Sequence, residues 1–325
     1  MGATNGPDPL LQIENLRVHY GAGRQQLNAV DGLSLTVGAG QTVAIVGESG
    51  SGKSSAAMAL VNGLAANGEW EADRILFQGE EISRHELLRL RGRAITYMMQ
   101  DPSGALNPVL TVGEQIKRVL KYHTQLSKAE REEQAIELME RVEIPDAASR
   151  LDAFPHEFSG GMQQRIVLAM ALAPSPVLLI ADEPTTGLDV TVEAQIFALL
   201  DRLKRELSMS VVLVAHDLGV VATSADEAVV LYAGRVVETG SVAALFQQPR
   251  HPYTMGLLHC AHDLHDENVL NPIPGRIPGL GERPQGCVFH PRCAWKTAEC
   301  EAAVPELIQL DGQSVACIHH ENLTE

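Results

Sequence analysis

The feature that most constrains the fold is a glycine-rich segment, residues 47–54, with the sequence Gly-Glu-Ser-Gly-Ser-Gly-Lys-Ser. It follows a short, continuous apolar run at residues 42–46, which predicts a strand covered on both faces, and it opens residues 53–64, whose composition favours a helix. In that context the glycines let backbone N–H groups converge on phosphate oxygens, and the helix N-terminus adds partial positive charge. The segment therefore predicts a phosphate-binding loop in which Lys53 reaches the β- and γ-phosphates and the Ser54 hydroxyl ligates Mg²⁺.

Strand and helix patterns alternate along much of the chain, which implies an α/β fold with a parallel sheet wrapped by helices. Further buried strands are expected at residues 94–99, 177–181, 211–215 and 228–232, and helices at residues 162–173, 191–207 and 218–225. Residues 10–20 and 27–37 alternate apolar and polar side chains, which predicts half-buried antiparallel strands.

Strand patterns are missing between about residues 101 and 165, where residues 112–122 and 128–143 have the apolar spacing of amphipathic helices. We expect a helical insert within the α/β domain. Beyond residues 242–246, prolines and glycines predict irregular chain leading into a cysteine-rich end.

Composition limits the possible partners of the 325-residue chain. Its net charge of −16 repels polyanions, so nucleic acid is a poor partner. The longest apolar stretches fall short of the roughly 18 residues that span a bilayer, and the N-terminus lacks the pattern of a signal peptide. We expect a cytosolic chain that does not cross a membrane itself.

Two adjacent acids, Asp182 and Glu183, end the apolar run at residues 177–181. Asp182 is placed to hold Mg²⁺, as the carboxylate at a strand end does in phosphoryl-transfer sites. Glu183 is then available to polarise an attacking water.

A second candidate anion site is Ser159-Gly160-Gly161, which precedes the predicted helix at residues 162–173. Such a helix cap is a weak signal when it stands alone. A chain with one phosphate loop has no evident need for another, and the segment therefore suggests a site completed by a second subunit.

In order and spacing, these motifs resemble those of the ATPase subunit of an ABC transporter over about residues 10–250. The matching positions are residues 47–54, Gln100, residues 159–163, Asp182 with Glu183, residues 187–189 and His216. The resemblance implies an ABC-type P-loop ATPase with a RecA-like core, an antiparallel β subdomain and a helical insert at about residues 101–165. It also implies ATP and Mg²⁺ as ligands and a head-to-tail dimer.

The resemblance implies roles for particular residues. Lys53, Gln100, Glu183 and His216 are the implied catalytic positions, and Ser54, Gln100 and Asp182 the implied Mg²⁺ positions. The implied nucleotide-binding residues are Tyr20, Gly47, Ser49, Gly50, Ser51, Gly52, Lys53, Ser54, Ser55, Ser159, Gly160, Gly161 and Asp189. Tyr20 resembles the aromatic residue that stacks on adenine, and core packing is the alternative because a single aromatic residue is a weak signal.

A narrower resemblance is to the oligopeptide, dipeptide and nickel importer branch of this family. It rests on residues 100–102 with 106–108, on residues 182–191, and on His251-Pro252-Tyr253-Thr254. Gly187 stands where the family more often has alanine, a departure that glycine's conformational freedom makes inconsequential. The branch carries a C-terminal extension from the His-Pro-Tyr element, so we expect an ATPase domain at residues 1–250 and an extension at residues 251–325.

Four of the five cysteines, Cys287, Cys293, Cys300 and Cys317, lie in this extension, and Cys260 stands apart. In a reducing cytosol such a group favours metal or cluster ligation over disulfides. Some members of the branch bind a [4Fe–4S] cluster with four C-terminal cysteines, and four thiolates are the ligand number that such a cluster takes. Zinc, with or without His290 or His319, and unliganded thiols are the alternatives; the spacings lack the Cys-x₂₋₄-Cys pair usual for zinc.

The resemblance also implies the partners: a second ATPase subunit, similar but distinct, two transmembrane permease subunits and a periplasmic or extracellular solute-binding protein. We expect the chain at the cytoplasmic face of the cell membrane, powering import of a small solute, with di- or oligopeptides favoured over nickel. A soluble ABC ATPase acting on nucleic acid or ribosomes is the alternative from another class, and a redox sensor in which the cluster gates ATP use is a third.

Overall fold

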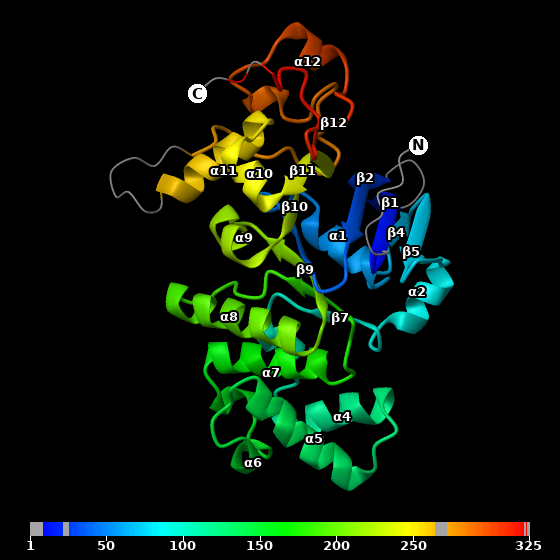
Figure 1. Cartoon of the computed structure of the whole chain (residues 1–325), viewed down its shortest axis with the longest axis vertical. Coiled ribbons are helices and arrows are strands. Elements are labelled where there is room, and N and C mark those ends of the chain that lie inside the picture. Colours follow the sequence, from blue (N-terminus) through cyan, green and yellow to red (C-terminus); the bar gives the residue numbers. More distant parts are fainter. Residues whose placement is uncertain (1–8, 22–25, 264–271, 322, 324–325) are drawn as a thin grey trace. The chain divides into compact units, whose positions relative to one another are not determined.

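A computed structural model of the chain describes residues 9–21, 26–263, 272–321 and 323, which form an α/β protein in two compact units (Figure 1). The first unit combines the described parts of Met1–Ser83 and Leu213–Glu325, and the second is Arg84–Val212. The predicted α/β class is confirmed. The expected division at residue 250 stays a prediction. Within the described ranges, no helix has both the length and the apolar composition needed to cross a bilayer.

The first unit contains an antiparallel sheet, drawn in blue and cyan in Figure 1. Its strands are β1 (Leu11–Tyr20), β2 (Leu27–Val37), β4 (Gly68–Glu71), β5 (Arg74–Phe77) and β6 (Glu80–Glu81). Their order is β2-β1-β5-β6, and β4 also pairs with β1. The two strands expected at residues 10–20 and 27–37 are confirmed, whereas the short strands β4 to β6 were not predicted because they lack a clear apolar alternation.

The same unit contains strands paired in the order β12-β13-β11-β10-β3. Their bounds are β3 (Thr42–Val46), β10 (Glu227–Tyr232), β11 (Arg235–Ser241), β12 (Ile308–Leu310) and β13 (Gln313–Val315). Strand β3 pairs in parallel with β10, and every residue of β3 is buried. Because β13 pairs with β11 and β12 pairs with β13, the end of the cysteine-rich region adds two strands to the edge of the sheet.

Five helices and a short 3₁₀ helix belong to the described part of this unit. They are α1 (Lys53–Leu60), α9 (Leu218–Ser224), α10 (Val242–Gln247), α11 (Pro252–Asp263), the 3₁₀ helix His290–Arg292 and α12 (Ala298–Ala302). Helix α1 ends earlier than the predicted residue 64, because Asn62 has a φ of 47° and the Gly63 N–H turns back to the Met58 carbonyl. The expectation of irregular chain beyond residues 242–246 was only partly right, since α11, α12, β12 and β13 lie there.

The second unit contains the helical insert, drawn in green in Figure 1. The elements of the whole unit are α2 (Arg84–Leu90), β7 (Ile95–Met98), α3 (Pro102–Ala105), α4 (Val112–His123), α5 (Lys128–Arg141), α6 (Ala147–Arg150), the 3₁₀ helix Pro155–Glu157, α7 (Gly160–Leu172), β8 (Leu178–Asp182), α8 (Val190–Glu206) and the start of β9 (Ser210–Ala215). Strands β7 and β8 pair in parallel, and helices α4, α5 and α7 pack against one another. Helices α3 to α6 agree with the predicted helical insert, and its bounds at about residues 101–165 stay a prediction.

Candidate nucleotide-binding and catalytic site

The phosphate-loop sequence adopts a conformation that only glycine allows at two points. Gly47 has a φ of 156°, and a Cβ there would overlap the Leu231 carbonyl. Gly52 has a φ of 104°, and a Cβ there would overlap the Ala29 carbonyl. The backbone therefore passes so close to neighbouring strands that side chains at these positions are excluded.

Lys53 begins helix α1 directly after this loop and is 4% exposed. Its Nζ donates hydrogen bonds to the carbonyls of Gly47, at 2.8 Å, and Glu48, at 3.1 Å. The ammonium group is thus directed back across the loop. The Ser51 hydroxyl is buried in the same loop and has no hydrogen-bond partner among the described residues. A phosphate oxygen is the kind of acceptor that both groups would fit.

Tyr20 ends strand β1, and its hydroxyl lies 3.2 Å from the Ser55 hydroxyl of helix α1. The structure thus brings two of the predicted nucleotide-binding residues together. Tyr20 is half-buried, with its ring against Gly68. Its stacking on adenine stays a prediction.

The acidic residues predicted for the chemistry end strand β8 in the second unit. Asp182 is 3% exposed, and its Oδ2 accepts a 2.6 Å hydrogen bond from the Tyr97 hydroxyl. Burial, followed by the nearby Asp182 carboxylate, raises the pKa of Tyr97, so this hydroxyl remains a donor. The contact fixes the carboxylate of Asp182 at the end of its strand.

Glu183 turns away from the strand with a φ of 42°. Its Oε2 accepts hydrogen bonds from Gln100 Nε2, at 2.8 Å, and from the Thr186 hydroxyl, at 3.0 Å. Gln100 also donates to Thr186 at 3.3 Å. Two predicted catalytic residues are therefore joined directly, and Thr186, which the sequence analysis did not assign, completes the triangle.

Ser159 is the N-cap of helix α7, where its hydroxyl accepts the Met162 N–H at 3.4 Å. Ser159 and Gly160 are exposed, whereas a Cβ on Gly161 would lie only 2.6 Å from Val192 of helix α8. Gly161 therefore allows two helices to approach closely. Asp189 caps helix α8 by accepting the N–H groups of Thr191 and Val192.

The predicted site residues are divided between the units. Tyr20, residues 47–55 and His216 belong to the first unit, where His216 is exposed just after strand β9. Gln100, residues 159–161, Asp182, Glu183 and Asp189 belong to the second. Within each unit the residues form the local groups described above.

Four cysteines line one small pocket in the cysteine-rich region, together with His290 and His319. Burial raises the pKa of Cys287 and Cys293, and that of Cys317 to about 12; the neighbouring thiols raise each of them further. Backbone N–H groups point at sulfur, as at Cys317, whose Sγ accepts from His319 at 3.4 Å. Among the described residues, no group of three or more His, Cys, Asp or Glu side chains has the geometry to hold a metal ion.

The His251–Thr254 motif has a structural explanation in this fold. Glu238 of β11 is fully buried, and its carboxylate accepts the N–H groups of Arg250, at 2.6 Å, and His251, at 3.0 Å. His251 Nδ1 in turn accepts the Tyr253 N–H at 3.0 Å, which caps helix α11. Burial raises the pKa of Glu238 to about 7 and lowers that of His251 to about 3.

Solved structures with the same fold are ATP-binding cassettes. The dimeric, post-hydrolysis state of the ATP-binding cassette MJ0796 bound to ADP and Pi matches with a TM-score of 0.62 at 27% identity, over 71% of this chain and 98% of that one. The cbiO1 subunit of Clostridium perfringens, part of the ABC transporter complex cbiONQ, matches with a TM-score of 0.62 at 25% identity, over 79% and 99%. Together with the phosphate loop, this fold defines the class of ABC-type P-loop ATPases.

Sequence comparisons give the family. The ABC transporter family model matches residues 30–186, and the model of the oligopeptide/dipeptide transporter C-terminal region matches residues 237–300. The dipeptide transport ATP-binding protein DppD of Escherichia coli is 45% identical over 95% of this chain and 96% of its own length. A putative peptide import ATP-binding protein of Brucella abortus is also 45% identical, over 95% and 94%. The chain belongs to the ABC transporter family, in the branch that carries this C-terminal region.

Proposed function

We propose that the chain is the ATP-hydrolysing subunit of an importer for di- or oligopeptides. The observation that carries the proposal is the pair at the end of β8, where buried Asp182 is fixed by Tyr97 and Glu183 is held by Gln100. The names of the 45%-identical relatives support peptides as the substrate. A nickel importer of the same branch is the second candidate, and the net charge of −16 disfavours nucleic acid.

The phosphate loop fits ATP. At Gly47 and Gly52 the loop backbone packs too closely against neighbouring strands for a side chain, which fixes the course of the loop, and the buried Ser51 hydroxyl and the Lys53 ammonium group supply donors. In our proposal Lys53 holds the β- and γ-phosphates, and Ser54, Gln100 and Asp182 hold Mg²⁺, which neutralises charge on the phosphates.

Hydrolysis then requires a base, and we assign this role to Glu183. Its carboxylate accepts a proton from the water that attacks the γ-phosphorus, and the bond from that phosphorus to the bridging oxygen breaks to leave ADP and phosphate. Gln100 orients Glu183 through the 2.8 Å hydrogen bond. His216 is assigned to the γ-phosphate.

The exposed end of helix α7 is assigned to a second ATPase subunit. Ser159 and Gly160 present backbone N–H groups and the helix dipole to solvent, which suits a phosphate on another chain. The dimeric form of MJ0796 supports a two-subunit arrangement. We place the pair at the cytoplasmic face of the membrane, with two permease subunits and a solute-binding protein.

We propose that Cys287, Cys293, Cys300 and Cys317 hold a [4Fe–4S] cluster with a structural or regulatory role. All four thiols line one pocket, and N–H groups directed at sulfur would stabilise thiolates. A single zinc ion would need sulfurs gathered around one point, within about 2.3 Å of it, and the described residues offer no such group. We prefer the cluster to zinc because four thiolates are the ligand number that a [4Fe–4S] cluster takes and because the cysteines lack the close spacing usual for zinc.

The hydrolysis proposal is tested in the complex reconstituted with its permease subunits and binding protein. Glu183→Gln should bind ATP normally but lose ATP hydrolysis and dipeptide uptake, whereas Glu140→Gln, an exposed acid on α5, should retain both. Near-normal hydrolysis by Glu183→Gln would remove Glu183 as the base. Uptake of Ni²⁺ without uptake of dipeptides would contradict the peptide substrate and favour the nickel importer.

The cluster proposal is tested on anaerobically purified protein. Iron and labile sulfide should be present in equal amounts and should be lost in Cys317→Ser but kept in Cys260→Ser. Zinc without iron in the wild-type protein would contradict the cluster.

A further inference from the structure

An acidic residue lies inside the phosphate loop. Glu48 directly follows Gly47, and the next residues up to Gly52 are only serine and glycine. A carboxylate at this position adds a negative charge where the phosphates of ATP would bind, and its repulsion weakens binding unless a cation offsets it.

That cation comes from the cysteine-rich region. Arg292 Nη1 donates to Glu48 Oε2 at 2.7 Å and Arg292 Nη2 donates to Glu48 Oε1 at 3.0 Å, a two-pronged contact across 244 positions of sequence. The Arg292 side chain is 6% exposed and that of Glu48 is 27% exposed, so water screens the pair only partly. Arg292 immediately precedes Cys293.

Arg292 is itself held in one orientation. Its Nε donates to the Pro274 carbonyl at 2.7 Å, and its Nη2 also donates to the Ile273 carbonyl at 3.1 Å. The guanidinium group lies 5.7 Å from the centre of the Tyr232 ring and 6.0 Å from that of Phe289. Several segments of the chain therefore fix the guanidinium group of Arg292 that binds Glu48.

The same loop residue is held at its backbone. The Glu48 N–H donates to the Tyr253 hydroxyl at 2.7 Å, and Tyr253 is fully buried. The Glu48 carbonyl accepts the Lys53 Nζ. One residue therefore links Tyr253 and Arg292 to the lysine assigned to the phosphates.

We propose that Arg292 and Tyr253 are positioning residues for ATP binding, which make the affinity of the phosphate loop depend on the C-terminal extension. Arg292 neutralises Glu48 and keeps its carboxylate turned from the nucleotide, and Tyr253 fixes the start of the loop. The inference rests on the proposed role of residues 47–54 in binding ATP. It also predicts that unfolding of the segment around Cys293 displaces the adjacent Arg292 and thereby weakens ATP binding by the phosphate loop.

The test is a charge-swap cycle on the full-length chain, with ATP affinity measured by titrating a fluorescent ATP analogue. Arg292→Gln leaves the Glu48 carboxylate uncompensated and should weaken binding on the order of tenfold. Glu48→Gln should bind at least as tightly as the wild type. The double variant Glu48→Gln/Arg292→Gln should recover to within about threefold of the wild type, because both charges are gone.

Recovery in the double variant separates positioning from simple support of the fold. If Arg292 only stabilised the fold, the double variant would be as weak as Arg292→Gln, and that result would overturn the proposal. Normal affinity in Arg292→Gln would also overturn it. Tyr253→Phe, which removes only the hydroxyl, should weaken binding by about threefold.

Two controls complete the experiment. Lys296→Gln removes an exposed cation of the same region, paired only loosely with Glu301 at 3.6 Å, and should not change the affinity. Lys53→Ala should abolish binding. If Lys53→Ala binds ATP normally, the proposed nucleotide site fails, whereas loss in Lys53→Ala with no effect of Arg292→Gln contradicts only the positioning role.

Discussion

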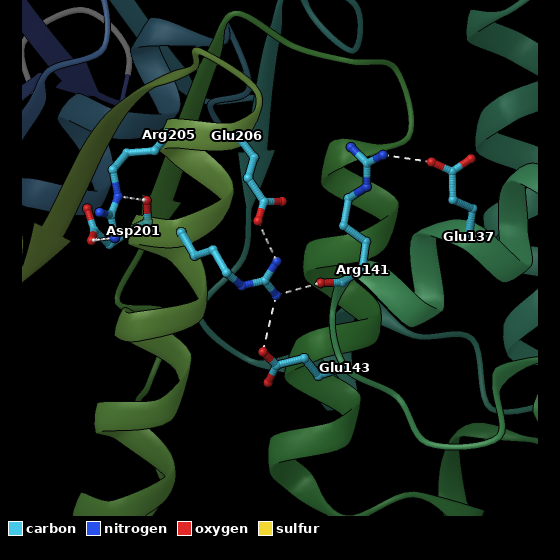
Figure 2. A network of polar contacts seen from close by, with 7 residues as sticks. Glu137, Arg141, Glu143, Asp201, Arg205 and Glu206 are labelled. Carbon is cyan, nitrogen blue, oxygen red and sulfur yellow. Dashed lines mark hydrogen bonds and ion pairs between the residues drawn. The ribbon is translucent and has the colours of Figure 1, made fainter.

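The helical insert and the C-terminal extension are stabilised by different kinds of contact. In the insert, Ser127 and Glu130 form a capping box at the start of α5, and exposed ion pairs join neighbouring turns and helices. Figure 2 shows one such pair, in which Arg141 donates to Glu137 on helix α5. Glu143, after the same helix, accepts a hydrogen bond from Arg202 of helix α8. In the extension, by contrast, buried rings and buried polar groups from distant parts of the chain make the contacts. The polar contacts at the surface of the insert are therefore mostly short-range, whereas those of the extension join it to the rest of its unit.

The largest contrast is expected from removing an aromatic ring. Phe289 is 3% exposed and packs against Tyr232 at 5.2 Å and Tyr253 at 5.4 Å between ring centres. Phe289→Ala should lower the free energy of unfolding by about 3–5 kcal/mol. Denaturant titration followed by the fluorescence of the two tryptophans, Trp70 and Trp295, measures it. Phe154→Ala, at a 37% exposed position of the insert, should cost less than about 1 kcal/mol; equal losses would break the comparison.

Acid should affect the extension through His251. Burial lowers its pKa to about 3, so between pH 6.5 and 3 the unfolded chain takes up a proton that the native state excludes. Stability is therefore lost as the pH falls through this range, by about 1.4 kcal/mol per pH unit at most.

The matched variant is His251→Asn, whose side-chain oxygen can still accept the Tyr253 N–H. Its unfolding free energy should fall less between pH 6.5 and 4 than that of the wild type. Glu238 acts oppositely, since its raised pKa, about 7, lets protonation stabilise the native state below pH 7, but it is present in both proteins. If the unfolding free energies of the two proteins fell in parallel with pH, His251 would be protonated in the native state as readily as in the unfolded chain, which would contradict the lowered pKa.

A smaller and more local effect is expected at the start of α5. Ser127→Ala removes the hydroxyl that accepts the Glu130 N–H, which should cost about 1 kcal/mol. Hydrogen exchange should quicken in the first turns of α5 and stay unchanged in peptides of the extension. An effect that spreads to the extension would contradict the local character of the insert.

The smallest effect is expected at Glu143. Its carboxylate accepts from Arg165 at 2.6 Å and from Arg202 at 3.1 Å, but its side chain is 52% exposed. Glu143→Gln should therefore lower stability by only about 0.5 kcal/mol, and less in high salt. The Arg165 hydrogen bond lowers the pKa of Glu143, so this contribution is present above about pH 4.5 and is lost as the pH falls through the lowered value. A loss matching that of Phe289→Ala, measured by the same titration, would contradict the comparison.

The contrast explains what could be predicted from the sequence. The insert and the strands β3 and β8 were predicted because apolar spacing and continuous apolar runs are local signals. The phosphate loop and the Asp182-Glu183 pair could likewise be proposed from the sequence, because each motif consists of residues that are adjacent in the chain. The Arg292–Glu48 contact could not be predicted, because single charged residues 244 positions apart look like solvated surface. Glu238 gave no sign of burial either, since an acid in a short strand is usually exposed.

The order of synthesis gives the contact between Arg292 and Glu48 a further consequence. Residues Arg84–Val212 are contiguous, so the second unit is complete long before the chain ends. The phosphate loop emerges early, but Arg292 follows 244 residues later, roughly 10–50 s at about 5–20 residues per second. Until then the Glu48 carboxylate has no guanidinium partner, so a nascent or C-terminally truncated chain would hold ATP weakly. Synthesis and folding of the segment that carries Arg292 would thus be the event that raises the ATP affinity of the phosphate loop.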